Sequence, residues 1–408
     1  MKNKYQKGLS ANILLLGIVS FLNDLSSEMI LPILPLFITA LGGTTLIVGI
    51  IGGLQESISS ILKVLSGFLS DRTGKRKIFV ASGYLTSAVF KLLLALSRLW
   101  QHILIFICFE RVGKGLRTAP RDAIIADSMP EARGKGFGIH RALDTAGAIA
   151  GSIVVLLLLI FLWSELEQNT DQIAFYKSTI FIAAIIAFLS LIPLYLVKEG
   201  KSEPQAIILQ ISLKKLPEAL KVFIGVATVF ALANFTYMFF ILKTMDAFTP
   251  LMPVKQSIAI VITLYIIFNI FYAVFAIPFG TLSDRIGRRK VLIAGYLLFS
   301  FTCLGFAFAD SVAVFLVLFM LYGLVYAIID GNQRAFVSDL STADLRATAL
   351  GTYHTLVGIV ALPASVIAGL LGTITPSWTF LFGSSVSFIS VILFIALRSH
   401  FEKKTQTF

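Results

Sequence analysis

The sequence has few charged residues for its length. Of its 408 residues only 14% are Asp, Glu, Lys or Arg, whereas 57% are hydrophobic. A soluble domain has about 25% charged and about 45–50% apolar residues. So few polar side chains cannot cover the surface of a globular protein in water. The composition therefore excludes an ordinary soluble protein and predicts an integral membrane protein.

The sequence also has few cysteines and histidines and lacks the common catalytic motifs. Cys108 and Cys303 both lie in apolar runs, which excludes a disulfide framework and a CxxC site. The histidines lack the spacing of metal ligands and stand at His102, His140, His354 and His400. The chain has no phosphate-binding glycine loop and no HExxH or GxSxG motif. We therefore expect no cofactor, no metal site and no enzymatic activity.

Positive charge predominates. The chain has 34 Lys and Arg but only 22 Asp and Glu, which gives a net charge of +12. In a soluble protein this excess can indicate nucleic-acid binding. In a membrane protein it is typical of cytoplasmic loops. We therefore expect a lipid bilayer, and no nucleic acid, as the partner of this chain.

Twelve apolar stretches have about the 20 residues that a membrane-spanning helix needs. They are predicted at residues 12–38, 46–68, 78–97, 102–121, 138–163, 178–197, 222–243, 256–281, 291–309, 312–335, 347–372 and 379–397. The first contains Asn23, Asp24 and Glu28 and no small-residue cleavage site, so it is expected to be a retained helix rather than a signal peptide. About 22 of the 34 Lys and Arg fall on the side of the termini and about three in the outer loops. This bias predicts a multi-pass protein of the plasma (inner) membrane with both termini in the cytoplasm.

The longest polar connection, residues 198–221, lies between spans six and seven. It predicts an N-terminal six-helix bundle over residues 1–197, a cytoplasmic linker over 198–221 and a C-terminal six-helix bundle over 222–408. The expected fold class is therefore an all-α membrane protein with twelve transmembrane helices in two bundles.

A charged phrase occurs once in each half. "GFLSDRTGKRK" begins at Gly67 and "GTLSDRIGRRK" begins 213 residues later at Gly280, with eight of eleven positions identical. A second pair, "ADSMPEARGKGFG" and "SDLSTADLRATALG", aligns Asp127 with Asp339 after spans four and ten. The two halves are thus predicted to be repeats of one unit, an arrangement typical of secondary transporters with a substrate site near mid-membrane.

These motifs resemble the major facilitator superfamily. G-x-L-S-D-R-x-G-[KR]-R-K is similar to its signature loop, and RVGKG from Arg111 to Gly115 is similar to its R-x-x-x-G signature. "FLNDLSSEMILPILPLF" and "ERVGKGLRTAPRDAIIAD" resemble a prokaryotic branch whose substrates are mostly unassigned. The resemblance covers nearly the whole chain. It implies two pseudo-symmetric bundles, alternating access and a monomer.

The resemblance also implies that the repeated loop packs against a helix of the opposite half and locks one access state. The expected latch residues are Gly67, Asp71, Arg72, Asp127, Gly280, Asp284, Arg285 and Asp339. We expect Arg72 and Arg285 to pair with acids at the inner helix ends, such as Asp122, Asp127 or Asp339, and the two glycines to permit close helix approach. The remaining basic residues of the loops are expected only to determine topology: Lys75, Arg76, Lys77, Arg288, Arg289 and Lys290.

The spans contain more ionisable residues than lipid tolerates, since each charge at the bilayer centre costs about 2.5–3.5 kcal/mol. These residues must face one another or a water-accessible cavity. The candidates for proton coupling and the substrate cavity are Asp24, Glu28, Glu110, Arg111, Lys114, Arg117, Asp144 and Asp330. Asp24 and Glu28 share one face of span one. Glu110, Lys114 and Arg117, with Arg121, form one seam along span four.

The residues leave the roles of these charges open. Asp24 and Glu28 either transfer protons between two environments or act as counter-ions of the span-four cations. Lys114 and Arg117 either bind an anionic group or pair with nearby acids. Arg121 is interpreted as an interfacial anchor. Two pairs, Arg141 with Asp144 and Asp330 with Arg334, are interpreted as structural.

The function expected first is secondary transport of a small organic solute by alternating access, coupled to protons. The cargo is either an amphipathic compound for export or an organic anion, such as a polycarboxylate or siderophore, for import. Gly147 and Gly151 have the spacing of an exporter element of the superfamily, but Ser152 stands where its proline would be. A non-transporting membrane receptor on the same fold is a further alternative.

Overall fold

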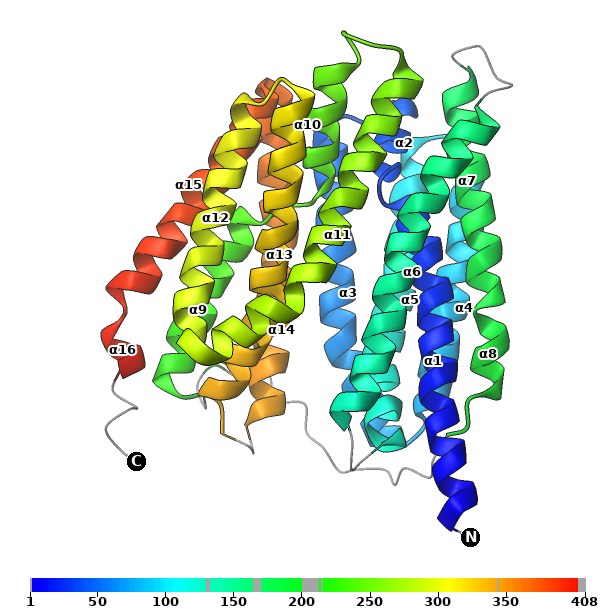
Figure 1. Ribbon diagram of the computed structural model, residues 1–408, viewed down its shortest axis with the longest axis vertical. Coiled ribbons are helices and arrows are strands. Elements are labelled where there is room, and N and C mark those ends of the chain that lie inside the picture. Colours follow the sequence, from blue (N-terminus) through cyan, green and yellow to red (C-terminus); the bar gives the residue numbers. More distant parts are fainter. Residues whose placement is uncertain are drawn as a thin grey trace. The chain divides into compact units, whose positions relative to one another are not determined.

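The computed structural model describes residues 2–129, 133–163, 170–199, 213, 216–342 and 345–402. These residues form helices and turns, and no strand occurs among them (Figure 1). The helices before the predicted linker are α1 (Lys2–Ile30), α2 (Leu34–Ala40), α3 (Thr45–Thr73), α4 (Arg76–Ala95), α5 (Trp100–Ser128), α6 (Arg133–Leu162), α7 (Thr170–Leu189) and α8 (Leu191–Leu196). Those after it are α9 (Glu218–Ala233), α10 (Met238–Phe248), α11 (Val254–Ile286), α12 (Arg288–Phe308), α13 (Val312–Leu340), α14 (Arg346–Ile374), α15 (Pro376–Ala396) and α16 (Ser399–Glu402).

Within the described ranges, 11 stretches are long and apolar enough to cross a membrane, and they match all the predicted spans but one. Three are interrupted: Ala11–Ala40 contains α1 and α2, Gln172–Leu196 contains α7 and α8, and Glu218–Phe248 contains α9 and α10. The remaining predicted span, 102–121, lies in α5, which is as long as its neighbours but rich in charge. The charged residues of α5 are Glu110, Arg111, Lys114, Arg117, Arg121, Asp122 and Asp127. The chain is a multi-pass membrane protein of the predicted all-α class.

The chain folds into two compact units. The first comprises Met1–Gly43, Ile58–Ile208 and Val254–Ile262, and the second comprises Thr44–Ser57, Leu209–Pro253 and Thr263–Phe408. Helices α3 and α11 each contribute one part to each unit. Most of the predicted linker, including residues 200–212, lies outside the described residues. The boundaries proposed from the sequence, 1–197 and 222–408, stay a prediction.

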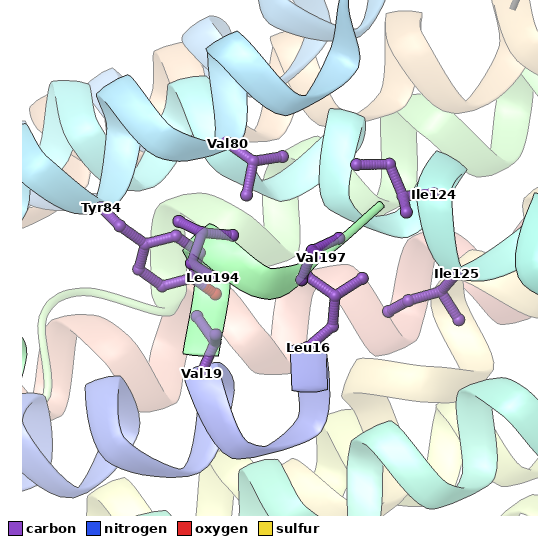
Figure 2. Packing of buried hydrophobic residues seen from close by; sticks show 8 residues of the cluster. All are labelled: Leu16, Val19, Val80, Tyr84, Ile124, Ile125, Leu194 and Val197. Atoms are coloured by element: carbon purple, nitrogen blue, oxygen red, sulfur yellow. The ribbon is translucent and has the colours of Figure 1, made fainter. Parts of the chain in front are cut away.

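In the first unit α1 packs on α6 and α4 packs on α5. A Cβ atom added to Gly147 or Gly151 of α6 would lie 2.3 Å from the carbonyl oxygen of Phe21 or Leu25 in α1. Glycine is therefore required for the two backbones to approach so closely. A buried apolar cluster joins α1, α4, α5 and the end of α8 (Figure 2): Leu16, Val19, Val80, Tyr84, Ile124, Ile125, Leu194 and Val197. These contacts hold in place the helices that carry most of the candidate charges.

In the second unit α12 packs on α13 and α15, and α9 packs on α14 and α15. Aromatic rings fill much of the interior of this unit. The rings of Phe230 and Tyr296 stack with their centroids 3.9 Å apart, and those of Phe240 and Tyr322 stack at 4.1 Å. Ring contacts in the second unit thus connect α9 with α12 and α10 with α13.

The seventh span is interrupted in its middle, between α9 and α10. Asn234 ends α9, and α10 begins at Met238. Across this break the N–H of Thr236 donates to Ser365 Oγ of α14 at 3.1 Å. A Cβ atom added to Gly52 of α3 would lie 2.4 Å from Thr236 Oγ1, so α3 also packs against the break. Irregular backbone at membrane depth is tolerated where protein or water surrounds it.

Candidate functional site

Two carboxyl groups of the first unit are in direct contact. Asp24 of α1 and Asp144 of α6 lie within hydrogen-bonding reach of each other. Ser20 Oγ donates to Asp144 Oδ1 at 2.7 Å, and Arg141 Nη1 donates to Asp144 Oδ2 at 3.1 Å. A carboxylate has no hydrogen to donate, so a hydrogen bond between two carboxyl groups requires a proton on one of them. Asp144 accepts from Ser20 and from the charged Arg141, whereas Asp24 accepts from the neutral Asn23 amide at 3.2 Å, so a proton shared by the pair would reside on Asp24.

A largely buried arginine of α5 is connected to this carboxyl pair. Arg121 Nη1 donates to Ser20 Oγ at 3.3 Å, and Arg121 Nε and Nη2 donate to Asp122 Oδ1 at 3.2 and 3.0 Å. Its side chain is only 15% exposed. Arg121 thus has protein partners on α1 and α5, and its interpretation as an interfacial anchor stays a prediction. Arg121 and Lys114 both act electrostatically on Asp24, so cations flank the pair from α5.

Arg117 of the predicted span-four seam is engaged by protein groups. It is 3% exposed, and its Nη1 donates to Ser87 Oγ of α4 at 2.5 Å. Its guanidinium lies over the ring of Tyr84, 4.5 Å from the centroid. Its charge also acts on Glu110. These contacts favour pairing within the protein over the binding of an anionic solute.

Glu110 is a buried acid among cations. It is 4% exposed, and its Oε2 lies 3.1 Å from Arg111 Nε. Lys91, Arg117 and Lys114 also act on it electrostatically. Lys91 of α4 is 2% exposed and donates to Ser26 Oγ and Ser27 Oγ of α1 at 3.0 and 2.9 Å. The charges of α4 and α5 thus form one network that reaches α1.

Glu28, the other acid of span one, also faces α6. A Cβ atom added to Gly151 would lie 3.0 Å from the Cβ atom of Glu28. Glu28 and Asp24 are therefore placed along one face of α1, as their spacing predicts.

The predicted pair of the second unit forms in the structure. Arg334 Nη2 donates to Asp330 Oδ2 at 2.6 Å. Tyr272 of α11 donates to the same oxygen through its hydroxyl at 2.9 Å. Both charged side chains are about half exposed, at 43% for Asp330 and 42% for Arg334. Asp330 is thus held by two donors of its own unit.

The acids of the predicted latch in the first unit are joined by an arginine that the sequence pattern assigned only to topology. Arg76, the first residue of α4, lies with Nη2 3.1 Å from Asp71 Oδ1. Its Nη1 bonds Asp127 Oδ2 at the end of α5. Of the acids expected as partners of Arg72, Asp127 is bound by Arg76 instead.

The second unit has an equivalent ion cluster. Arg288, the first residue of α12, lies with Nη2 2.8 Å from Asp284 Oδ1, and its Nε bonds Asp339 Oδ2. Asp339, another of the acids expected as partners of the loop arginines, is likewise bound by Arg288 rather than Arg285. In the alignment of the two phrases Arg288 stands opposite Lys75, one position before Arg76. The same kind of ion cluster forms in both units despite this shift of one position, because Arg76 and Arg288 are each the first residue of the helix after the loop.

The two loop glycines differ in their surroundings. A Cβ atom added to Gly67 would lie 3.1 Å from the Cβ atom of Ala119, so Gly67 permits close packing as expected. A Cβ atom at Gly280 would meet nothing within 4 Å. The expectation of close helix approach at Gly280 is therefore wrong in this structure.

The sequence predicted no partner in these networks for several residues: Ser20, Arg76, Lys91, Tyr272 and Arg288. Lys91 could have been found, because a lysine in an apolar span needs polar partners. Arg76 and Arg288 could have been found as the basic residues that begin a helix just after an acid. Ser20 and Tyr272 carry no charge and give no such signal.

Comparison with known proteins gives one consistent family. A profile described as the Major Facilitator Superfamily matches residues 16–264 and 254–408. An uncharacterised MFS-type transporter of Methanocaldococcus jannaschii is 53% identical over 394 residues, which are 96% of each chain. The solved structure of the nucleoside transporter NupG is similar, with a TM-score of 0.75 at 15% identity over 96% of this chain and 99% of that one. A D-xylose–proton symporter has a TM-score of 0.73 at 14% identity, over 95% and 96% of the two chains. At these identities the two structures indicate a common fold.

Proposed function

Since this chain belongs to the major facilitator superfamily, we propose that it is a secondary active transporter that moves a small organic solute by alternating access and couples this movement to protons. The fold and family are those of a transporter rather than an enzyme. By their names, one protein of this fold is a nucleoside transporter and another is a symporter of D-xylose and protons. Those names support proton-driven uptake or release of a polar organic solute.

The contact between Asp24 and Asp144 carries the proposal of proton coupling. The hydrogen bond between the two carboxyl groups exists only while one proton is bound. Loss of that proton leaves two like charges in contact, which costs free energy in a medium of low dielectric constant. Release of the proton therefore favours any conformation that separates the two carboxylates or brings Arg121 closer. This dependence of conformation on protonation is what coupled transport requires.

The proposed membrane orientation has both termini in the cytoplasm of a cell whose plasma (inner) membrane holds the protein. The excess of Lys and Arg in the segments on the side of the termini supports it. In this orientation both ion clusters, around Arg76 and Arg288, lie on the cytoplasmic side. We propose that residues 1–197 and 222–408 are the two moving halves and that these clusters control the cytoplasmic closure.

The contacts of the span-four cations weigh against an organic anion as the solute. Arg117 and Arg121 already bind Ser87, Ser20 and Asp122. A bound anion would have to replace these protein groups. A non-transporting receptor would bind a solute in the same way but would not accumulate it against a gradient.

Proteoliposomes with an imposed pH gradient test the proposed function. The probes are labelled amines, nucleosides, pentoses and carboxylates. We expect gradient-driven accumulation of at least one class, its loss in Asp24→Asn, and no loss in Asp310→Asn, a matched change in an exposed loop. Accumulation that is the same with and without the pH gradient, or that persists in Asp24→Asn, would contradict proton coupling at this pair.

A further inference from the structure

An acid in the middle of a membrane span lacks an ionic partner in the part of the chain that the structure describes. Glu56 lies eleven residues into α3, about 17 Å along a span of about 30 Å, and its side chain is exposed. None of the ion pairs found among the described residues includes Glu56. A carboxylate at this depth is costly in lipid and marks a functional position by default.

The surroundings of Glu56 lie in the same unit and at the same depth. Its part of α3 belongs to the second unit, with α9, α10 and α13. Its charge acts on the phenol of Tyr326, which lies midway along α13. The Tyr322 hydroxyl donates to the Tyr326 hydroxyl at 3.4 Å, and the side chain of Asn234, at the break of the seventh span, lies within hydrogen-bonding reach of Tyr326. Gly52, four residues before Glu56 on the same face of α3, packs against Thr236 of the break, so Glu56 lies one helical turn from this interruption of a spanning helix.

Asn234 presents an unused acceptor at this break. Its Oδ1 is buried and has no hydrogen-bond partner among the described residues. The amide nitrogen is therefore the atom of this side chain that is left to interact with Tyr326. A buried carbonyl oxygen without a donor costs about 1–3 kcal/mol, and a bound solute with an N–H or O–H group would remove that cost.

Aromatic rings lie around Tyr326 and at the start of α10. The ring of Tyr326 lies 5.1 Å from that of Tyr322 and 5.5 Å from that of Phe268, in edge-on contacts. The ring of Tyr237, at the start of α10, lies 6.0 Å from that of Tyr265. Aromatic faces attract cations and stack on planar rings. A carboxylate, an unused carbonyl and phenol rings all favour a positively charged solute that donates hydrogen bonds.

We propose that Glu56, Asn234 and Tyr326 form a recognition site for the protonated amine of the solute, with the surrounding rings contacting its apolar or aromatic body. The ammonium group would form a charge-assisted hydrogen bond with Glu56 and donate to Asn234 Oδ1. This inference rests on the proposed transport function and specifies its substrate class as amphipathic organic amines. It also separates the roles of the units, with proton binding in the first and solute recognition in the second.

Three indoles that differ in one group test the site: tryptamine is a cation, tryptophol is neutral and indole-3-acetate is an anion. Equilibrium binding to purified wild-type protein is measured by calorimetry at neutral pH. We expect tryptamine to bind about tenfold or more tightly than either of the others. In Glu56→Gln this preference should disappear, whereas Glu56→Asp should keep it in part. Asn234→Ala should weaken tryptamine binding without abolishing the preference for the cation.

Glu218→Gln is the matched control, because it removes an acid from the exposed start of α9. It should leave all three affinities unchanged. Equal affinities for the three indoles, no binding of tryptamine to the wild type, or an unaltered preference in Glu56→Gln would each overturn the proposal. These measurements need no gradient, so amine recognition can fail while proton-driven flux persists, and flux can fail while amines still bind.

Discussion

The buried charges described in the first unit are compensated by groups on their own helix and on neighbouring helices. Lys91 of α4 binds Ser26 and Ser27 of α1, and Arg117 of α5 binds Ser87 of α4. Glu110 is the acid that these cations share. In a medium of low dielectric constant, removal of one member leaves the others without compensation.

Glu110→Gln should therefore destabilise the protein strongly. The variant leaves Lys91, Arg111 and Arg117 without their acid, and breaking a buried ion pair costs about 3–5 kcal/mol. Thermal unfolding in detergent measures the effect as a fall in Tm. Glu56→Gln serves as the comparison, because the described ion pairs do not include Glu56, and its Tm should stay near that of the wild type. A Tm for Glu110→Gln equal to that of the wild type would show that the network contributes nothing to stability.

At the residue scale the sequence located the charges but not their partners. Asp24, Glu110 and Asp144 were all found, because acids in apolar spans are conspicuous. Ser20 and Asp144 are 124 residues apart, and nothing in their spacing along the chain predicts their contact. The acids of the two ion clusters were predicted from the repeated phrases, but the pairing with Arg76 depends on where α4 begins.

At the scale of helices, close packing depends on a few glycines. Gly147 and Gly151 bring the backbone of α6 against Phe21 and Leu25 of α1. This approach is what places Asp144 beside Asp24. The glycine spacing that resembles an exporter element therefore has a packing role in this chain.

Gly151→Leu should separate α1 from α6. The added side chain would overlap the Leu25 carbonyl group and Glu28 Cβ, and overpacking typically costs about 1–3 kcal/mol. The expected result is a lower Tm together with a weaker pH dependence of any transport. Gly138→Leu lies on the same helix, where an added Cβ atom meets nothing within 4 Å. It should be tolerated. Equal effects of the two substitutions would contradict the assigned α1–α6 contact.

The positions of the spans were predictable because a run of about 20 apolar residues matches the thickness of the bilayer and is rare in chains that do not cross it. The interruptions were not predictable. The break between α9 and α10 falls on Asn-Phe-Thr-Tyr, which contains neither proline nor glycine. Contacts with Ser365 and Gly52 stabilise it, and these residues lie far away in the sequence.

At the scale of the whole molecule, the two halves repeat one ion cluster. Arg76 joins Asp71 and Asp127, and Arg288 joins Asp284 and Asp339. The repeated phrase therefore repeats a set of contacts as well as a charge pattern. Such a pair of clusters suits the two related halves of an alternating-access cycle.

Asp71→Asn should fold normally but shift the balance between inward-open and outward-open states. Because Asp71 and Asp127 share Arg76, Asp127→Asn should shift the balance in the same direction. A loss of about 1 kcal/mol in one state changes the population ratio about fivefold. The measurement is the labelling rate of single cysteines introduced on each face, with Asp310→Asn as the control. Unchanged labelling on both faces in the two variants would contradict the proposed latch.

The central claim is that the molecule carries one proton between Asp24 and Asp144 and uses it for coupling. Infrared difference spectroscopy of the reconstituted protein detects a protonated carboxyl group directly through its C=O stretch, without any knowledge of the solute. We predict a protonated carboxyl band at neutral pH that disappears when the pH is raised and that is absent from Asp24→Asn. The claim is contradicted if the wild type shows no such band, or if the band is unchanged in Asp24→Asn.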